Sequence, residues 1–339
     1  MPISDIGQPE AKDPRRIGFL LIDGFAMMSF ASAIEPLRAA KVLAGRPLYE
    51  WVTIGVGGRA IIASTGLSVR AHHLVGAEVD LDTVFVCAGG NPAAFVDQTT
   101  LQWLRRLARR GVRIGGVSGG PFILARAGLL DGYRCTIHWE HIPAFTESFP
   151  GLNTKLSLYE IDRDRLTCAG GVAALDMMHA MISEQHGRGL ADEIGEWFLQ
   201  TEIRLGTGAQ RRSLQDRYNT ANARLLSALE LIETHIEDPL DRRFLAAAAG
   251  ISVRQLERLF ATHLGTTLDR HYRDVRLNRA RLLLRQTTMS IAEVGFASGF
   301  QSASHFSRAY RARFGHAPNV ERAAAPQRNP PRFDRADRR

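Results

Sequence analysis

A serine lies between glycines in the stretch Gly-Val-Ser118-Gly-Gly, which follows a short apolar run and precedes a helical pattern. This spacing is typical of a nucleophile elbow, a strand-to-helix turn that exposes a hydroxyl above a sheet. His138, 20 residues further on, is a candidate general base, and the amides after Ser118 are candidate donors to an oxyanion. A catalytic triad also needs a group that orients the histidine, and the sequence identifies none. The motif therefore predicts a binding turn, with a Ser/His hydrolase as the alternative.

Strands and helices alternate around this turn. Apolar runs predict strands over residues 17–22, 49–56, 82–90, 113–117 and 165–169, with an irregular hairpin over 61–69. Helical spacing predicts helices over residues 30–42, 99–110, 122–127 and 173–185, the first of them capped by Ser29 and disturbed by Pro36. Such alternation predicts an α/β fold with a doubly wound parallel sheet. Ligands of that fold bind at the carboxyl ends of the strands.

Groups that could bind a small zwitterion lie at these strand ends. The amides of the Ser118 turn and of the Gly90-Asn91 loop suit a carboxylate. Glu35 and Trp139 suit an ammonium group through charge and cation–π contact, unless Glu35 is only a structural partner and Trp139 a core residue. We expect an amino acid or a betaine-like amine as ligand. The predicted ligand-binding residues are Glu35, Gly90, Asn91, Ser118, Gly119, His138 and Trp139.

The sheet order, the Ser118 turn and the stretch AGLLDGYRCTIHWE over residues 127–140 resemble the PfpI/ThiJ branch of the class I glutamine amidotransferase-like superfamily. The resemblance covers about residues 15–190 and implies a flavodoxin-like sheet. Members often carry a cysteine at the tip of the turn, a histidine about twenty residues on and a glutamate in the first helix. The matching positions are Ser118, His138 and Glu35. A serine hydroxyl gains far less than a thiol from a helix N-terminus. The resemblance therefore implies a ligand sensor without catalysis, and an amidase tethered to DNA is the alternative.

A second motif lies in residues 295–315, GFASGFQSASHFSRAYRARFG. Ile291, Val294 and Phe296 predict the apolar face of one helix, and Gly299 predicts a turn. Ser302 or Ser304 caps a second helix, whose apolar stripe is Phe306, Ala309, Tyr310 and Phe314. The opposite, polar face suits a helix that enters a major groove. An amphipathic helix pair without a DNA role is the alternative.

The chain carries this motif twice. Leu256, Arg258, Phe260, Leu264 and Gly265 recur as Phe306, Arg308, Tyr310, Phe314 and Gly315 at an offset of 50 residues. The offset is 49 between Gly250 and Gly299, so the second turn is one residue longer. An apolar-periodic helix over residues 268–284 joins the two units. A repeat of equivalent arginines favours function over accident.

Two such units resemble the DNA-binding domain of AraC/XylS transcription regulators over about residues 220–320. That family usually ends the domain with Pro-Ser, an aromatic and a basic residue, and this chain has Pro318-Asn319-Val320-Glu321-Arg322. We expect the departure to alter the last turn and not the fold. The resemblance implies these DNA-binding residues: Ser252, Arg254, Glu257, Arg258, Ala303, Ser304, Ser307, Arg308 and Arg311. It also implies a small-molecule inducer, recruitment of RNA polymerase and a homodimer. Phosphate contact is the alternative role for each arginine.

The charge is divided unevenly along the chain. Residues 1–219 hold 23 Lys and Arg against 23 Asp and Glu, whereas residues 220–339 hold 20 against 12. The whole excess of +8 therefore lies in the C-terminal part, as expected of a nucleic-acid reader joined to a neutral domain. Cys87, Cys135 and Cys168 have no ligand or disulfide spacing, so we expect buried free thiols, no metal and no cofactor.

These observations predict a domain organisation. We expect a disordered lead-in over 1–14, a ligand-sensing domain over 15–205, a linker over 206–219, a DNA-binding domain over 220–322 and a disordered basic tail over 323–339. The chain has neither a signal-peptide core nor an apolar run long enough for a membrane, so we expect a cytoplasmic protein. The sequence leaves the inducer, the operator and the sign of regulation open.

Overall fold

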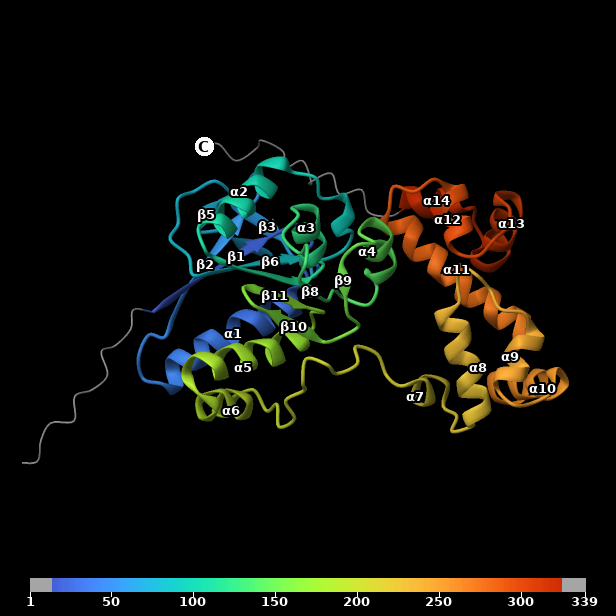
Figure 1. Cartoon of the computed structure of the whole chain (residues 1–339). Coiled ribbons are helices and arrows are strands. Elements are labelled where there is room, and N and C mark those ends of the chain that lie inside the picture. The colour runs from blue at the N-terminus through green and yellow to red at the C-terminus, as the bar shows by residue number, and fades with distance from the viewer. Residues whose placement is uncertain (1–13, 325–339) are drawn as a thin grey trace, which may run out of the picture. The chain divides into compact units, whose positions relative to one another are not determined.

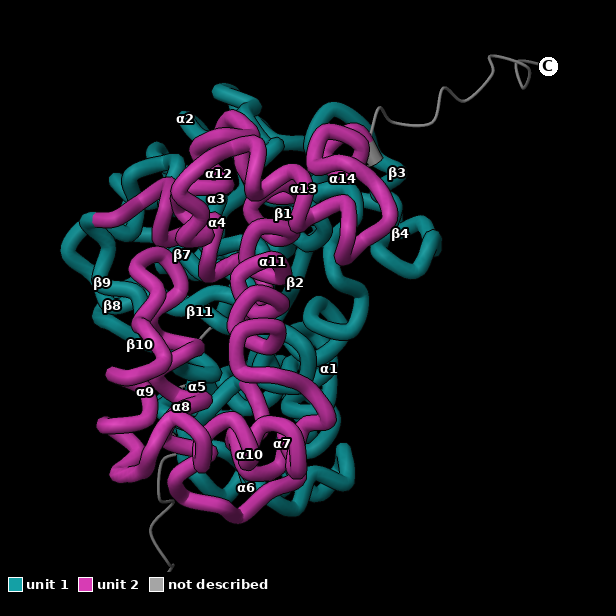
Figure 2. The backbone as a smooth tube through the Cα atoms, turned by 90° about the vertical axis from the view of Figure 1, so that its right-hand side faces the viewer, with its two compact units in different colours: residues 1–138, 151–210 teal, residues 139–150, 211–339 magenta. Residues whose placement is uncertain are grey.

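The computed structural model describes residues 14–324, so residues 1–13 of the predicted lead-in and most of the predicted tail lie outside the described residues. The chain divides into two compact units. Unit 1 comprises residues 1–138 and 151–210, and unit 2 comprises residues 139–150 and 211–339 (Figure 2). No helix in the range 14–324 is long and apolar enough to span a membrane.

Unit 1 is built on a seven-stranded sheet in the order β10-β11-β7-β6-β1-β2-β5. Its strands are β1 (Arg15–Leu21), β2 (Tyr49–Gly55), β5 (His73–Leu74), β6 (Thr83–Ala88), β7 (Arg113–Ser118), β10 (Tyr159–Asp162) and β11 (Arg165–Cys168). All neighbours pair in parallel except β10, which is antiparallel to β11. Two short pairs accompany the sheet, the predicted hairpin of β3 (Ala60–Ile62) with β4 (Ser68–Arg70), and β8 (Arg134–Cys135) with β9 (Asn153–Thr154).

Helices cover both faces of this sheet (Figure 1). On one face α1 (Met27–Leu43), α5 (Ala173–His186) and α6 (Arg188–Trp197) share an apolar core with the strands. On the other face lie α2 (Gln98–Arg109) and α3 (Gly120–Arg126), which contact β6 and β7, together with the short 3-10 helix η1 (Pro92–Ala94). The central strands are buried on both sides, as continuous apolar runs require. The predicted doubly wound α/β sheet is confirmed.

The start of α1 differs from the prediction. The helix begins at Met27, its N-cap is Ala26, and Ser29 lies inside the first turn. The hydroxyl of Ser29 accepts a hydrogen bond from the backbone N–H of Gly171 at 2.7 Å instead of capping the helix. Pro36 is buried within the helix and does not end it. The prediction of a Ser29 cap was therefore wrong, because the hydroxyl binds Gly171, a residue far away in the sequence.

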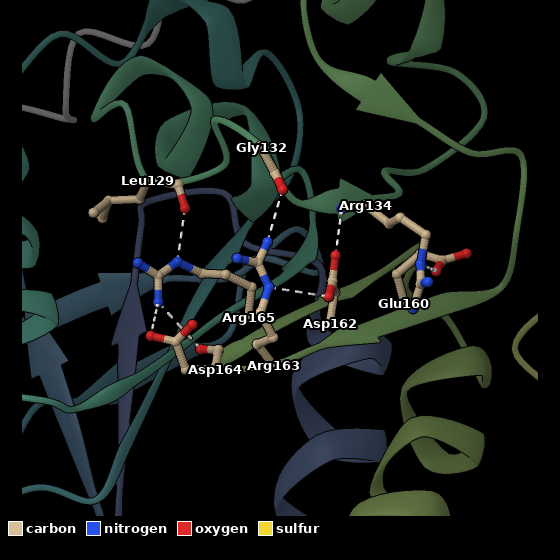
Figure 3. A network of polar contacts seen from close by, with 8 residues as sticks. All are labelled: Leu129, Gly132, Arg134, Glu160, Asp162, Arg163, Asp164 and Arg165. Carbon is tan, nitrogen blue, oxygen red and sulfur yellow. Dashed lines mark hydrogen bonds and ion pairs between the residues drawn. The ribbon is translucent and has the colours of Figure 1, made fainter.

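A polar network fixes the β10–β11 hairpin and the neighbouring β8 (Figure 3). Arg165 is buried and donates to the Leu129 carbonyl and the Asp164 carboxylate, each at 2.7 Å. The carboxylate of Asp162 accepts from the backbone N–H of Arg134 at 2.8 Å. Arg134 also pairs with Glu160 at 3.2 Å. The chain that leaves β8 towards His138 therefore starts from a fixed position in unit 1.

Unit 2 is helical. It contains α4 (Ile142–Ser148), α7 (Leu214–Tyr218), α8 (Ala223–Thr234), α9 (Arg242–Ala248), α10 (Val253–Leu264), α11 (Leu268–Gln286), α12 (Ile291–Ala297), α13 (Ala303–Phe314) and α14 (Pro318–Ala324). The stretch 206–219, predicted as a linker without periodicity, includes α7, which Ser213 caps. The predicted joining helix is α11, and α14 forms despite the unusual Pro318 sequence.

Two apolar clusters form the core of unit 2. One gathers around Leu229, Leu256 and Phe260, and the other around Leu283, Phe306 and Tyr310. Phe296 was predicted to face inward, but 53% of its surface is exposed. Gly295 lies on the buried face instead, where an added Cβ would be 3.2 Å from the Phe306 ring. The prediction for Phe296 was wrong because α12 packs its glycine against α13 and turns the phenylalanine outward.

Candidate ligand site and DNA-binding surface

The Ser118 turn has the backbone of a nucleophile elbow. Ser118 ends β7 with φ of 60°, a left-handed conformation that is strained for a residue other than glycine. Its side chain is buried, and the next N–H, that of Gly119, donates to the Ala88 carbonyl at 3.0 Å. Gly120 then begins α3, and a Cβ there would lie 2.0 Å from the Val86 carbonyl oxygen. The glycine therefore allows α3 to start directly against β6 and holds the turn tight.

The α1 residue beside Ser118 is Ser29. Gly170, which follows β11, shows this proximity, because a Cβ on Gly170 would lie 2.7 Å from the Ser118 Cβ and 2.8 Å from the Ser29 Oγ. Glu35 is six residues further along α1, about 240° around the helix from Ser29. It forms an ion pair with Arg38 at 2.6 Å, and 44% of its side chain is exposed. The structure thus brings Ser29, and not Glu35, to the turn.

Sequence reasoning missed Ser29 as a site residue. The signal was available, because Ser29 is the first polar residue of the helix that follows β1 and lies in its first turn. In the resemblance stated above, a glutamate from the first helix and a cysteine at the turn supply the chemistry. Here both positions at the turn hold serine.

The Gly90-Asn91 loop lies next to the turn. A Cβ on Gly119 would be 3.1 Å from the Pro92 side chain, and Arg126 of α3 donates to the Ala93 carbonyl at 2.8 Å. Asn91 Oδ1 is buried and has no hydrogen-bond partner among the described residues. Since buried acceptors are nearly always paired, this oxygen has the capacity to accept one further hydrogen bond.

His138 and Trp139 follow β8 but belong to different units. The backbone N–H of His138 donates to the Ser118 carbonyl at 3.3 Å, so this residue is beside the turn. The ring of Trp139 lies in unit 2, where the guanidinium of Arg211 stacks 4.8 Å from its centre. Arg211 therefore already occupies one face of the aromatic surface that was predicted to receive a ligand cation.

The three cysteines are buried free thiols, as predicted. Burial raises the pKa of Cys168 to about 12 and that of Cys135 to about 11, and it also raises the pKa of Cys87. These thiols are protonated at neutral pH and are not activated nucleophiles. They do not replace the missing thiol at Ser118.

The two predicted helix-turn-helix units are α9–α10 and α12–α13. Gly250 and Gly299 have φ of 65° and 77° in the two turns. The second interhelical segment, residues 298–302, is one residue longer than the first, residues 249–252, as predicted. Ser252 caps α10 in a capping box with Gln255, and Ser302, one of the two predicted candidates, caps α13.

The predicted DNA-binding residues lie on the outer faces of α10 and α13. Both recognition helices bury their apolar stripes, with Leu256, Phe260, Phe306 and Tyr310 all at 0% exposure. The exposed residues are Ser252, Arg254, Glu257, Arg258, Ser304, Arg308 and Arg311, and the half-buried ones are Ala303 and Ser307. Glu257 pairs with Arg242 of α9 at 3.4 Å, so it is partly engaged within the protein. Arg258 and Arg308 occupy equivalent exposed positions.

Glu321 of α14 is a second site that sequence reasoning missed. Its carboxylate is buried and accepts hydrogen bonds from Tyr310 at 2.9 Å, Arg281 at 3.1 Å and Arg285 at 2.5 Å. Burial alone would raise the pKa of Glu321, but these three donors outweigh it and hold the pKa below its usual range. Glu321, within the stretch that departs from the usual ending of the family, therefore anchors α14 to α11 and α13.

Comparison with known proteins matches both units. The DJ-1/PfpI family covers residues 15–184, and the Helix-turn-helix domain family covers residues 245–324. HTH-type transcriptional regulator GlxA of Rhizobium meliloti is 48% identical over 310 residues, 91% of this chain and 96% of that protein. HTH-type transcriptional regulator GbdR of Pseudomonas aeruginosa is 42% identical over 322 residues, 95% of this chain and 88% of that protein. A crystal structure of an AraC family transcriptional regulator from Pseudomonas putida is similar, with 30% identity, a TM-score of 0.51 and coverage of 55% of this chain and all of that one.

Proposed function

We propose that a small amine or zwitterion bound at the Ser118 turn switches this protein on as an activator. The chain belongs to the family of HTH-type transcriptional regulators that carry a DJ-1/PfpI domain before an AraC-type DNA-binding domain. The observation that carries the proposal is the Ser118 turn itself. It keeps the backbone of a nucleophile elbow while holding serine at both Ser118 and Ser29. The turn is retained as a binding site and its chemistry is gone.

The groups beside Ser118 favour a site without catalysis. A serine nucleophile needs a base held in place by a third group. The α1 side chain at the turn is the Ser29 hydroxyl, which is a poor substitute for a carboxylate in proton transfer. Relatives of nearly the same length are named as regulators, which is consistent with this proposal.

The buried Asn91 Oδ1, which has no hydrogen-bond partner among the described residues, indicates the class of ligand. Asn91 Oδ1 accepts an N–H from the ligand, whereas the Gly119 N–H, which was predicted to suit a carboxylate, already donates to the Ala88 carbonyl. A primary or secondary ammonium satisfies Asn91, whereas a fully methylated ammonium has no N–H to donate. We therefore rank amino acids and amines above betaines.

The action on DNA follows from the paired recognition helices. α10 and α13 are proposed to enter successive major grooves, about 34 Å apart on one face of the duplex. Arg258 and Arg308 are proposed to read base edges from equivalent positions. A homodimer in the cytoplasm recruits RNA polymerase when the ligand is bound.

A ligand screen tests the sensor proposal. Full-length protein is melted with amino acids, betaines, carnitine-like amines and polyamines, and each solution is then assayed for product. We expect one class to raise the melting temperature and to be recovered unchanged. Asn91→Leu removes the shift, whereas Asn153→Leu, at an exposed amide of the same unit, retains it. A compound that wild type consumes and Ser118→Ala does not would establish the hydrolase instead.

A further inference from the structure

Residues 139–150, here named the crossing segment, leave unit 1 and return to it. Their neighbours in the chain, His138 and Gly151, are both in unit 1, yet the segment itself is part of unit 2 (Figure 2). Its helix α4 packs against α11, with Ala144 and Phe145 fully buried. A loop of the ligand-binding fold therefore contributes to the core of the DNA-binding unit.

A buried polar contact fixes α4 to the end of α11. The ring Nδ1 of His141 is 3.0 Å from Gln286 Oε1, and both residues are less than 10% exposed. Separating them would break a hydrogen bond between two buried polar side chains, which is unfavourable. The start of the crossing segment and the C-terminal turn of α11 therefore move as one body.

The crossing segment starts directly after His138, a residue that contacts the proposed ligand site. Thr136 is fully buried, and its backbone N–H donates to Thr167 Oγ1 of β11 at 2.9 Å. Two residues later His138 donates to the Ser118 carbonyl at 3.3 Å, which is a long bond. His138 is thus the last residue before the crossing segment and touches the turn that is proposed to bind the ligand.

From Gln286 the contacts continue to the second recognition helix. The preceding residue, Arg285, donates to Glu321 Oε1, and Glu321 Oε2 accepts from the Tyr310 hydroxyl of α13. These contacts join the end of α11 to α14, and α14 to α13, the recognition helix of the second helix-turn-helix unit. The first recognition helix, α10, packs on α8, α9 and α11.

We propose that the crossing segment transmits the state of the Ser118 turn to α13, through His141, Gln286, Arg285 and Glu321. This inference rests on the proposed function and adds its route. Ligand occupancy moves the Ser118 carbonyl, His138 follows, and α4 shifts the end of α11 on which α13 and α14 are mounted. The second helix-turn-helix unit is the regulated one, and the first is the constant one.

Because coupling between two sites is reciprocal, DNA is a sufficient probe. A duplex is selected from a random library by the full-length protein, and hydrogen exchange is followed by mass spectrometry with and without it. We expect the duplex to slow exchange in α10 and α13, and to change exchange over residues 136–150 by about fivefold or more. Gln286→Leu and His141→Leu abolish the change over 136–150 and leave protection of α10 in place.

Two controls keep the experiment decisive if a variant is destabilised. Asn278→Leu makes the same kind of change at an exposed amide of α11 and retains the response. His141→Asn rescues it, because its amide nitrogen can take the place of the ring Nδ1. Protected recognition helices with unchanged exchange over 136–150, or a change that persists in Gln286→Leu, overturns the inference. Failure to select any duplex overturns the DNA-binding function, and the inference with it.

Discussion

The two helix-turn-helix units share their turn but are attached to the protein differently. In both, the residue after the turn glycine donates to the first helix, Ile251 to the Ala246 carbonyl at 3.0 Å and Phe300 to the Gly295 carbonyl at 2.9 Å. The first unit packs on α8, where Glu233 binds Arg217 and Tyr218 of α7. The second is held by Glu321 and by the end of α11 that carries α4.

Under the proposals above, this difference means that a repeat can duplicate a recognition helix without duplicating its control. The recognition helices must be alike because they meet the same kind of groove. Their supports need not be alike. Both supports include α11, but the described contact with the crossing segment, His141 to Gln286, is at the end of α11 that carries the second unit.

The largest expected effect comes from Glu321. Glu321→Ala leaves the buried Tyr310 hydroxyl and two arginines without their acceptor, and we expect it to lower the free energy of unfolding by about 3 kcal/mol. The matched change is Glu257→Ala in the first unit, whose ion pair with Arg242 is about half exposed on both sides. That variant should lose less than about 1 kcal/mol. Chemical denaturation measures both, and equal losses would contradict the asymmetry.

The next effect concerns the equivalent arginines. Arg258→Ala and Arg308→Ala should each weaken binding to the selected duplex by about 1–3 kcal/mol if both read base edges. Fluorescence anisotropy gives the affinities, and a panel of single-base changes shows which base each arginine reads. A loss for Arg258→Ala alone, with Arg308→Ala unchanged, would show that only the first unit reads bases.

Smaller effects are expected at the helix caps. Ser252→Ala and Ser302→Ala each remove a side-chain acceptor from a recognition helix and should cost about 1 kcal/mol. The loss should be larger at Ser252, where Gln255 completes a capping box. Thermal denaturation compares the two, with Ser304→Ala as a control that leaves both caps intact. A larger loss at Ser302 would reverse the comparison.

The smallest expected effect is the pH dependence of the two supports. Burial alone would raise the pKa of Glu233, but Arg217 and Tyr218 outweigh it, so Glu233, like Glu321, titrates below the usual 4.5. A depressed pKa gives stability that is present above pH 4.5 and is lost as the pH falls through the folded-state pKa. The advantage of wild type over Glu233→Gln and Glu321→Gln should therefore shrink on acidification. A constant difference from pH 7 to pH 3 would contradict this.

Local features of the sequence predicted both units well. The glycine turns, serine caps and apolar stripes of α10 and α13 are written in neighbouring residues, so the helix-turn-helix units and even the extra residue of the second turn were predictable. The parallel sheet followed from alternating strands and helices for the same reason.

The contacts at the site were less predictable because they depend on residues far apart in sequence. Ser29 and Ser118 both lie against Gly170, a proximity that sequence spacing does not reveal. Glu35, the predicted site residue of α1, pairs with Arg38 instead. The packing of α4 on α11 joins residues 145 positions apart. No local pattern encodes such a contact.

The most direct test of the account is the affinity of the full-length protein for its selected duplex, with and without the metabolite that raises its melting temperature. The account predicts that the metabolite changes the affinity by about fivefold or more and is recovered unchanged. It also predicts that Gln286→Leu binds the metabolite normally but shows no change in DNA affinity. An affinity that is the same with every metabolite and with none, or a metabolite that is consumed, would contradict it.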